Sequence, residues 1–407
     1  MYFIRLLLCT FFMLLFYRPE LQAKVALPYA LNKKPTVCLN MIVKNESHVI
    51  IRCLDSVLPM IDYWVICDTG STDGTQKIIK DYMQEKNIPG ELHEHEWVNF
   101  GHNREEALRL ALFKADYVIF MDADDILNFD DDFKMPRLIH DCYMVRSKAG
   151  STEYLLTRII KSSLNWHWHG VLHEYVYSEN VKQCALLGGV EYIYICDGAR
   201  ANDPERFLKD AKILHAALEK EPDNARYMFY LGQTYASAHK QEEALEYYQK
   251  RVDMGGWEEE VFWAMVQIAQ LKISLGHDEK SVEESFIKAL KFRPTRPEPY
   301  YYLIREARIK GEFQKGYELG REVIKMPPSK DVLFIEAKSY DALKLEFALC
   351  AWWAGHYQEC LDATLDLLKK DLPPELRHYV IEAHKAAQEK LQEKDINDAI
   401  DDIFASD

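Results

Sequence analysis

The sequence predicts an α/β domain built on a parallel sheet, followed by an all-α array of helix pairs. In residues 36–200, short apolar runs alternate with helical periods, a pattern typical of a parallel sheet covered by helices on both faces. In residues 201–392, nearly every segment has helical period and is interrupted by Gly or Pro. We therefore place the boundary between the two parts near Asp197–Arg200.

The first residues have the order of a secretory signal peptide. A short start with one positive charge precedes the apolar run Leu6–Phe16, and a polar stretch then ends in Ala23. This run is shorter than the roughly 20 apolar residues that a membrane span needs. We interpret residues 1–23 as a signal peptide that directs export, with an uncleaved, cytosol-facing membrane anchor as the alternative, and residues 24–35 as a linker.

The composition indicates a globular protein and disfavours some ligands. The chain has 407 residues, of which 48% are hydrophobic and 28% charged, with a formal net charge of -15. This charge repels nucleic acid, so a phosphate-bearing ligand must be held locally by a metal or by a few cations.

The cysteines indicate neither a disulfide framework nor a zinc site. Nine are spread over a long chain without a pair of C-x-x-C motifs. Several lie in apolar runs, as Cys38 and Cys67 do, and we expect those to be buried free thiols.

The first part begins with two strand, loop and helix units and continues into a third strand. The predicted strands cover residues 36–43, 63–67 and 117–121, and the predicted helices cover residues 46–58, 75–85 and 103–115. An acidic cluster, Asp122-Ala123-Asp124-Asp125, follows the third strand. In open α/β sheets ligands bind at the carboxyl ends of the strands, so the cluster stands where a site is expected.

Two carboxylates spaced i, i+2 at a strand exit suit a hard divalent cation. Mg²⁺ and Mn²⁺ prefer oxygen ligands and bind one or two carboxylates together with substrate phosphates. A solvated acidic turn is the alternative, because Asp-x-Asp alone is common. Upstream, Asp68–Thr75 is a Gly- and hydroxyl-rich loop that either contacts a ligand or caps the following helix. It is neither a Walker loop nor a dinucleotide fingerprint.

Four motifs in this order resemble the family 2 glycosyltransferases with the GT-A fold. They are CLNMIVKNE at 38–46, CDTGSTDGT at 67–75, HNR at 102–104 and MDADD at 121–125. The resemblance covers residues 36–194, and it implies a Rossmann-like mixed sheet, a nucleotide-sugar donor that is usually UDP-linked, and a bound Mn²⁺ or Mg²⁺.

The resemblance also implies roles for individual residues. Asp68 would contact the uracil or ribose, and Glu46 would line the nucleotide pocket. Asp122 would bind the ribose or a metal-bound water, while Asp124 would ligate the metal directly. Arg104 would lie near the uracil or the diphosphate. Its alternative is a surface cation paired with a glutamate on its own helix.

A further motif, Trp-x-Gly-x-x-His-Glu at 168–174, looks like the element that follows Asp-x-Asp in lipopolysaccharide-core and peptide S-glycosyltransferases. His173 could then supply a nitrogen ligand to the metal or bind the diphosphate. Glu174 is a candidate general base, which an inverting transfer needs close to the acceptor. Asp125 is the second candidate base, and the sequence leaves both open. A structural His–Glu pair is the alternative for the motif.

The second part has the tetratricopeptide period. Pro294 and Pro328 are separated by 34 residues, and Leu231, Gly232, Tyr235, Ala244 and Tyr248 carry the expected large, small and aromatic side chains. Such helix pairs stack into a solenoid, which could bind an acceptor polypeptide or a second copy of the chain as a homodimer. Residues 393–407 form an acidic tail.

Together these observations predict a metal-dependent, inverting glycosyltransferase that acts on a protein, peptide or glycan acceptor. A non-catalytic adaptor, in which the repeats carry the function and the first domain is degenerate, is the main alternative. A nucleotidyltransferase is less favoured because the first strand is not followed by a basic pyrophosphate-binding loop.

Overall fold

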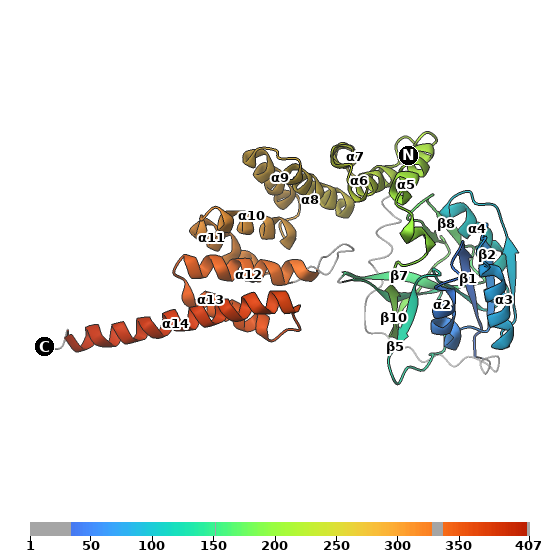
Figure 1. Ribbon diagram of the computed structural model, residues 1–407, viewed down its shortest axis with the longest axis horizontal. Coiled ribbons are helices and arrows are strands. Elements are labelled where there is room, and N and C mark those ends of the chain that lie inside the picture. Colours follow the sequence, from blue (N-terminus) through green and yellow to red (C-terminus); the bar gives the residue numbers. More distant parts are fainter. Residues whose placement is uncertain (1–33, 151, 328–336, 405–407) are drawn as a thin grey trace. The chain divides into compact units, whose positions relative to one another are not determined.

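The computed structural model describes residues 34–150, 152–327 and 337–404, and the chain divides into two compact units (Figure 1). The first contains the residues up to Lys148 together with Leu155–Asp203, and the second contains Ala149–Tyr154 and the chain from Pro204 onward. The signal peptide predicted at residues 1–23 lies outside the described residues. None of the helices described has the length and apolar character needed to cross a membrane.

The first unit is built on an eight-stranded sheet with the order β3-β2-β1-β4-β7-β6-β10-β5. The strands are β1 (Val37–Val43), β2 (Tyr63–Asp68), β3 (Gly90–Glu94), β4 (Tyr117–Phe120), β5 (Ile126–Phe129), β6 (Cys142–Ala149), β7 (Thr152–Lys161) and β10 (Cys184–Tyr194). Strands β3, β2, β1 and β4 are parallel, whereas β7 pairs with β4 and β5 pairs with β10 in antiparallel fashion. The parallel half confirms the pattern read from the apolar runs, and the mixed sheet confirms the fold that the resemblance implied.

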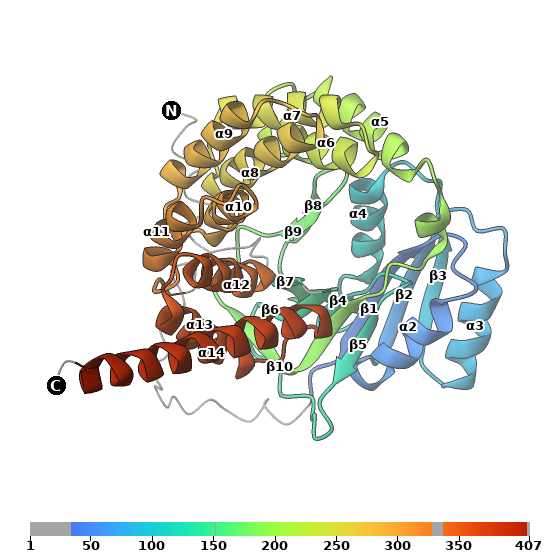
Figure 2. The ribbon, with the colours of Figure 1, turned by 60° about the vertical axis from the view of Figure 1, so that its left-hand side comes forward.

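Helices cover both faces of this sheet because the strand side chains alternate. The helices are α2 (Ile50–Val57), α3 (Thr75–Glu85) and α4 (Phe100–Ala111), with short 3₁₀ turns η1 (Leu58–Met60) and η2 (Ala199–Asn202). Val37, Leu39 and Met41 of β1 pack with α2 and α3, whereas Cys38 faces the cluster that contains α4. Figure 2 shows α4 on the side of the strands opposite α2 and α3.

Two helices differ from the predicted bounds for local reasons. The helix predicted from residue 46 begins at Ile50, because Asn45 has a left-handed φ of 60° and the Glu46 carbonyl accepts the Val49 amide in a turn. The helix predicted over residues 103–115 begins at Phe100, where the Asn99 side chain caps the His102 amide at 2.9 Å, and it ends at Ala111 before the left-handed Phe113.

One disulfide joins two strands of the first unit. Cys142 in β6 and Cys184 in β10 are bonded, with their Cα atoms 4.6 Å apart. Cys38 and Cys67 are buried free thiols, as expected, and burial raises the pKa of each to about 12. The disulfide itself was not predicted, because cysteine spacing does not reveal which strands become neighbours.

The second unit is an array of helices in which each packs against the next along the chain. The helices are α5 (Arg206–Leu218), α6 (Ala225–Ser237), α7 (Gln241–Met254), α8 (Glu258–Ser274), α9 (Glu279–Phe292), α10 (Pro297–Ile309), α11 (Phe313–Val323), α12 (Ala337–Trp353), α13 (Tyr357–Leu368) and α14 (Pro374–Phe404). The small residues that the repeat pattern requires sit where helices approach closely. A Cβ atom on Gly232 of α6 would lie 2.8 Å from the Tyr248 ring of α7.

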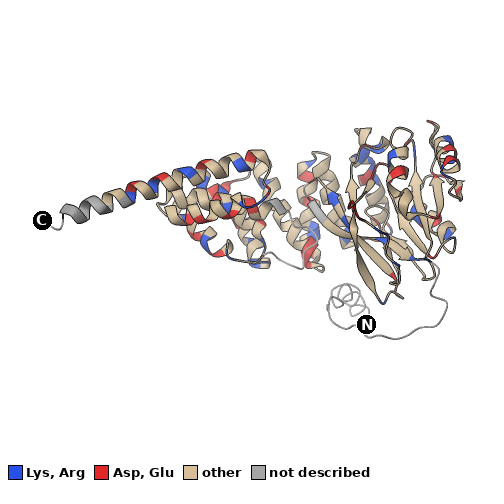
Figure 3. Ribbon diagram, turned by 90° about the horizontal axis from the view of Figure 1, so that it is seen from below, with Lys and Arg blue, Asp and Glu red and all other residues tan. Residues whose placement is uncertain are grey.

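The repeat aromatics mostly form the core of this unit. Tyr227, Tyr230 and Tyr248 are at most 8% exposed. Charged residues of both signs are interspersed along the helices of the second unit (Figure 3). One set of charges is internal: Arg296, fully buried, pairs with Glu259 at 2.8 Å and with Glu298 at 2.5 Å.

Candidate active site

The site lies in the first unit, at the carboxyl ends of three neighbouring parallel strands. Strand β1 is flanked by β2 and β4, and all three run in the same direction. Asp68 is the last residue of β2, and Glu46 and Asp122 lie in the loops that follow β1 and β4. Because parallel strands end at one edge of a sheet, the topology brings these three sequence motifs to the same side of the molecule.

Asp68 ends β2 and is 1% exposed. Its Oδ1 atom accepts hydrogen bonds from the amides of Gly70 (2.9 Å) and Ser71 (2.8 Å), and from the Gln76 side chain at 3.1 Å. Its Oδ2 atom is buried and has no hydrogen-bond partner among the residues that the structure describes. A buried carboxylate oxygen without a donor is costly, so this position favours a ligand that brings an N–H or O–H group.

The first two motif loops are tied to each other. Asn45 accepts a hydrogen bond from the Thr72 amide at 2.7 Å and donates its own amide to the Ser71 hydroxyl at 2.8 Å. Thr75 accepts the Glu46 amide at 2.8 Å. The hydroxyls of the Gly-rich loop therefore hold the loop after β1 in place.

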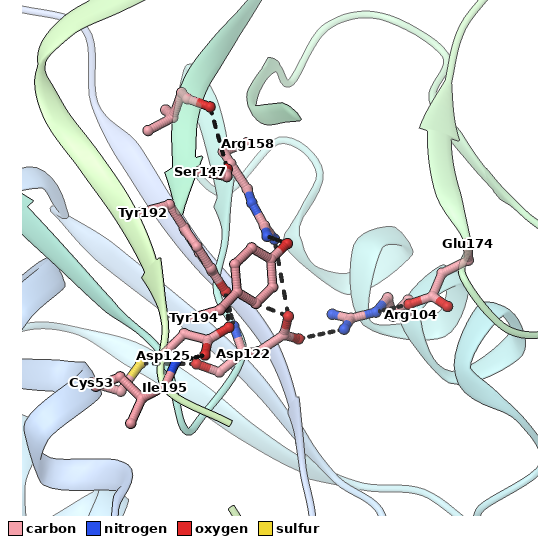
Figure 4. Close-up of polar contacts among 11 residues, drawn as sticks. Cys53, Arg104, Asp122, Asp125, Ser147, Arg158, Glu174, Tyr192, Tyr194 and Ile195 are labelled. Atoms are coloured by element: carbon pink, nitrogen blue, oxygen red, sulfur yellow. Dashed lines mark hydrogen bonds and ion pairs between the residues drawn. The ribbon is translucent and has the colours of Figure 1, made fainter. Parts of the chain in front are cut away.

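Asp122, directly after β4, is held between two arginines (Figure 4). Its Oδ1 atom accepts a hydrogen bond from Arg104 Nη2, and its Oδ2 atom lies 4.0 Å from Arg158 Nη1. Burial alone would raise the pKa of Asp122, but the two guanidinium groups hold it below its ordinary value. Asp122 is therefore a carboxylate paired with two cations and not part of a solvated acidic turn.

Arg104 also binds Glu174, with Nε 2.5 Å from Glu174 Oε1. Its side chain is only 12% exposed, and its guanidinium lies over the Trp168 ring at 5.4 Å. Burial would lower the pKa of Arg104, but Asp122 and Glu174 together raise it. The alternative of a surface cation paired within its own helix is wrong, because Arg104 instead links the acidic cluster to the Trp-x-Gly-x-x-His-Glu motif.

That motif forms a hairpin of two short strands, β8 (His167–His169) and β9 (Tyr175–Tyr177). Glu174 lies just before β9, and its side chain is 10% exposed. His173 precedes it with a left-handed φ of 53° and is exposed. The hairpin is anchored to α4 by the Trp168 amide, which donates to Glu105 at 2.8 Å.

Asp124 and Glu46 approach a common segment of backbone after β10. The Gly198 amide donates to Asp124 Oδ2 at 3.1 Å, and the Ala199 amide donates to Glu46 Oε2 at 3.2 Å. Burial, Asp124 and other nearby carboxylates raise the pKa of Glu46 to about 7, and burial and Asp122 raise that of Asp124. Arg52 fixes the same segment, because it binds Asp197 at 2.5 and 2.8 Å and the Asp124 carbonyl at 2.8 Å.

Asp125, the second candidate base, is buried at 2% exposure. Tyr192 donates its hydroxyl to Asp125 Oδ2 at 2.8 Å, and the Ile195 amide donates to Oδ1 at 3.1 Å. Burial and the neighbouring carboxylates Asp122 and Asp124 raise its pKa to about 7. Both oxygens thus serve contacts inside the fold, whereas Glu174 contacts a cation at the edge of the site.

Within the described residues, no three His, Cys, Asp or Glu side chains are grouped so as to hold a metal ion. The predicted ligands Asp122, Asp124 and His173 therefore do not form a preformed metal site. The donor chemistry still fits Mg²⁺ or Mn²⁺, because such ions bind one or two carboxylates and take further oxygens from substrate phosphates and water. With Asp122 paired to arginines, Asp124 is the carboxylate of the motif that fits a cation best.

Several residues at the site were missed by sequence reasoning: Arg52, Arg158, Tyr192, Tyr194 and Gly198. They come from α2, from the antiparallel strands β7 and β10, and from the segment after β10. No short motif marks them, and only the order of the strands brings them to Asp122 and Asp124. The sequence does contain Asp197–Gly198, but an Asp-Gly pair indicates a domain boundary as well as a ligand-binding segment.

Part of the chain is similar to a known protein family. Residues 38–149 match the family model described as glycosyl transferase family 2. Two curated relatives are the SPbeta prophage-derived glycosyltransferase SunS of Bacillus subtilis (strain 168) and the glycosyltransferase SunS of Bacillus phage SPbeta. Each is 24% identical over 247 residues, which cover 58% of this chain and 57% of the relative. The chain thus spans a little over half the length of the curated relatives that it matches.

Solved structures resemble the chain only loosely. The match to the crystal structure of MamA covers 50% of this chain and 98% of the MamA chain, at 18% identity and a TM-score of 0.31. YrrB, described as a TPR protein with an unusual peptide-binding site, covers 44% of this chain and 84% of its own, at 11% identity and a TM-score of 0.32. The helical array is therefore described by the contacts between its own successive helices.

Proposed function

We propose that this chain, whose residues 38–149 form a glycosyl transferase family 2 domain, transfers a sugar from a nucleotide-sugar donor to a protein, peptide or glycan acceptor. The observation that carries the proposal is the convergence of motifs at one sheet edge. Asp68, Asp122 and Glu174 come from three separate motifs, and Arg104 joins the second of these to the third. An adaptor with a degenerate domain would have no need of this paired, buried arrangement.

The donor is a uridine nucleotide on this proposal. Asp68 Oδ2 is a buried acceptor without a partner in the described part of the chain, and uracil presents an N–H group where cytosine presents an unprotonated ring nitrogen. The ribose hydroxyls are further donors for the same oxygen. Where uracil meets this oxygen, the proposal expects UDP-linked sugars to bind more tightly than CMP-linked sugars.

The reaction is an inverting, single displacement on this proposal. The acceptor's hydroxyl or thiol forms a bond to the anomeric carbon as the bond from that carbon to the diphosphate oxygen breaks. The acceptor's proton passes to the Glu174 carboxylate. The diphosphate leaves with the bonding electrons, and Arg104, fixed beside Asp122, supplies a cation near the developing charge.

A divalent cation fits beside these residues. Asp124 would hold Mn²⁺ or Mg²⁺, with Asp122 near by, and the ion would neutralise charge on the leaving diphosphate. We propose that activity depends on this metal, because the two carboxylates supply the oxygen ligands that such ions prefer. His173 stays a predicted ligand.

The compartment and the assembly also belong to the proposal. We propose export or membrane association, on the signal-like residues 1–23, and a homodimer or an acceptor contact through the repeats. In the second unit, Trp353 is 59% exposed and Tyr379 is 62% exposed, which supports a contact surface there.

The test measures donor binding by the full chain. We would titrate UDP-, GDP- and CMP-sugars by calorimetry with Mn²⁺ or with EDTA, using wild type, Asp68→Asn and Asp124→Ala. We expect one UDP-sugar to bind only with metal, to lose affinity in Asp68→Asn, and to lose its metal dependence in Asp124→Ala. Glu94→Gln, an exposed change on β3, is the control. If no nucleotide sugar binds with Mn²⁺ or with EDTA, the proposed function is wrong.

A further inference from the structure

A second arginine, Arg158, reaches Asp122 in addition to Arg104. Arg158 comes from β7, a strand outside every motif of the resemblance, and Figure 4 shows the two arginines approaching Asp122 from different directions. Arg104 contacts Oδ1, whereas Arg158 Nη1 lies 4.0 Å from Oδ2. Each oxygen of Asp122 thus has its own cation.

Arg158 is 7% exposed, so its charge needs compensation inside the protein. Its guanidinium lies 3.6 Å from the centre of the Tyr192 ring and 5.4 Å from that of Tyr194, and Nη2 donates a hydrogen bond to the Tyr194 hydroxyl. Asp122 is the carboxylate that it approaches. A flat guanidinium between two tyrosines is locked in one orientation, which an ammonium group could not reproduce.

Tyr192 connects this arginine to the rest of the acidic loop. The Tyr192 hydroxyl accepts the Asp122 amide at 3.1 Å, lies 3.4 Å from Asp122 Oδ2, and donates to Asp125 Oδ2 at 2.8 Å. Both ends of the Asp-Ala-Asp-Asp turn are therefore fastened to one phenol, and the guanidinium of Arg158 is stacked on that phenol.

We propose that Arg158 is a positioning residue that fixes the orientation of Asp122 for donor binding. The inference rests on the proposed function and names a residue that the motifs do not contain. A carboxylate with one partner rotates about its Cβ–Cγ bond, whereas a carboxylate held at both oxygens presents one set of lone pairs to a ligand. Arg158 and the Tyr192 hydroxyl on which it stacks both lie close to Oδ2, so Oδ1 stays in the position where Arg104 links it to Glu174.

The test is a double-mutant cycle on donor binding by the full chain. The four proteins are wild type, Arg158→Lys, Asp122→Asn and the double variant. Arg305→Lys, an exposed change on α10, serves as the control. Calorimetry gives the donor Kd, and initial rates give kcat and KM separately. Lysine keeps the charge but loses the planar stack, so the change addresses orientation.

We expect Arg158→Lys to weaken donor binding about tenfold in the wild-type background, the scale of one charged hydrogen bond. In the Asp122→Asn background we expect less than a twofold effect, because Arg158 then has no carboxylate to orient. A purely structural role would give the same factor in both backgrounds, and that result would overturn the inference. The Arg305→Lys control is expected to match wild type.

A milder variant covers the case in which Arg158→Lys does not fold. Tyr194→Phe removes only the hydroxyl that accepts the Arg158 hydrogen bond. We expect a smaller loss of donor affinity, again confined to proteins that retain Asp122, and an equal loss in both backgrounds would contradict the inference. A wild-type chain that binds no donor would instead overturn the proposed function, and this inference with it.

Discussion

Gly101 and Gly170 approach so closely that a Cβ atom on Gly101 would lie 1.9 Å from the Gly170 carbonyl oxygen. Gly101 is in the first turn of α4, three residues before Arg104, and Gly170 is in the hairpin that carries Glu174. The contact therefore sets the distance between the two motifs that Arg104 joins. Any side chain on Gly101 would collide with the backbone of the hairpin, so this position requires glycine.

We expect Gly101→Ala to separate α4 from the hairpin. Because the clash is with backbone, it cannot be relieved by a rotamer change, and we expect a loss of about 1–3 kcal/mol in the free energy of unfolding. Sugar transfer should fall at least tenfold, since Arg104 and Glu174 no longer meet. Urea unfolding and transfer assays measure both effects. Gly188→Ala, where an added Cβ meets nothing within 4 Å, is the matched control, and equal behaviour of the two variants would contradict this account.

The two candidate bases are separated by a pair of substitutions. We expect Glu174→Gln to retain donor binding and to lower the transfer rate by about 10²–10⁴, the contribution of a general base. Asp125→Asn should mainly lower the melting temperature, because both carboxylate oxygens serve contacts inside the fold. Kd, kcat and melting temperature are measured for each variant. A folded Asp125→Asn protein with normal donor affinity and no transfer would reverse the assignment.

Glu91 on β3 gives a pH-dependent contribution to stability. Hydrogen bonds from Lys114, from the Tyr63 hydroxyl (2.7 Å) and from His93 lower its pKa from 4.5 to about 2. A carboxylate with a depressed pKa stabilises the fold above its unfolded pKa of 4.5, and this stabilisation is lost as the pH falls through about 2. Glu91 and Lys114 are both partly exposed. We therefore expect Glu91→Gln to lower the free energy of unfolding by no more than about 1 kcal/mol at pH 7.

Urea unfolding at pH 7 and at pH 3 measures this effect. The difference between wild type and Glu91→Gln should shrink at the lower pH. Glu94→Gln, on the same strand, should show no comparable trend. A difference that grows toward pH 3 would have the wrong sign for a carboxylate stabilised in its charged form.

The disulfide between Cys142 and Cys184 should stabilise the first unit. The two cysteines are separated by 42 residues, and closing a loop of that length is worth about 2–4 kcal/mol by the chain-entropy model. We expect dithiothreitol to lower the melting temperature of wild type but not that of the Cys142→Ser/Cys184→Ser double variant. Peptide mapping without reductant identifies the bond directly. Equal sensitivity of both proteins to reductant would point to other cysteines.

The sequence predicted the parallel half of the sheet because its signals are local. Apolar runs mark β1, β2 and β4, and polar loops follow each of them, so the acidic cluster that begins at Asp122 could be assigned to the carboxyl edge of the sheet from the sequence. The start of α2 was misjudged by a few residues, since the left-handed Asn45 and the turn after it precede the first helical residue.

The remaining half of the site depends on contacts between distant strands. Arg158 and Tyr192 lie 36 and 70 residues beyond Asp122, on strands whose order carries no sequence signature. Arg104 was assigned to the site through the resemblance alone, and its contact with Glu174 spans 70 residues. Residue type and spacing along the chain hold no information about such partners, so the pairing of the carboxylates had to come from the fold.

The backbone amides of Gly198 and Ala199 have a practical consequence for protein engineering. A Cβ atom at position 198 would lie 2.9 Å from Glu46 Oε2 and 3.0 Å from Asp124 Oδ2, so a larger residue there would push these two carboxylates away from the backbone. This segment comes after β10, where a designer trimming the first unit would be tempted to cut. A truncation at Tyr194 would keep every strand of the first unit and every motif, yet it would remove the backbone amides that donate hydrogen bonds to Glu46, Asp124 and Asp125. Any chimera that exchanges the helical array for another module must therefore inherit the chain through Asp203.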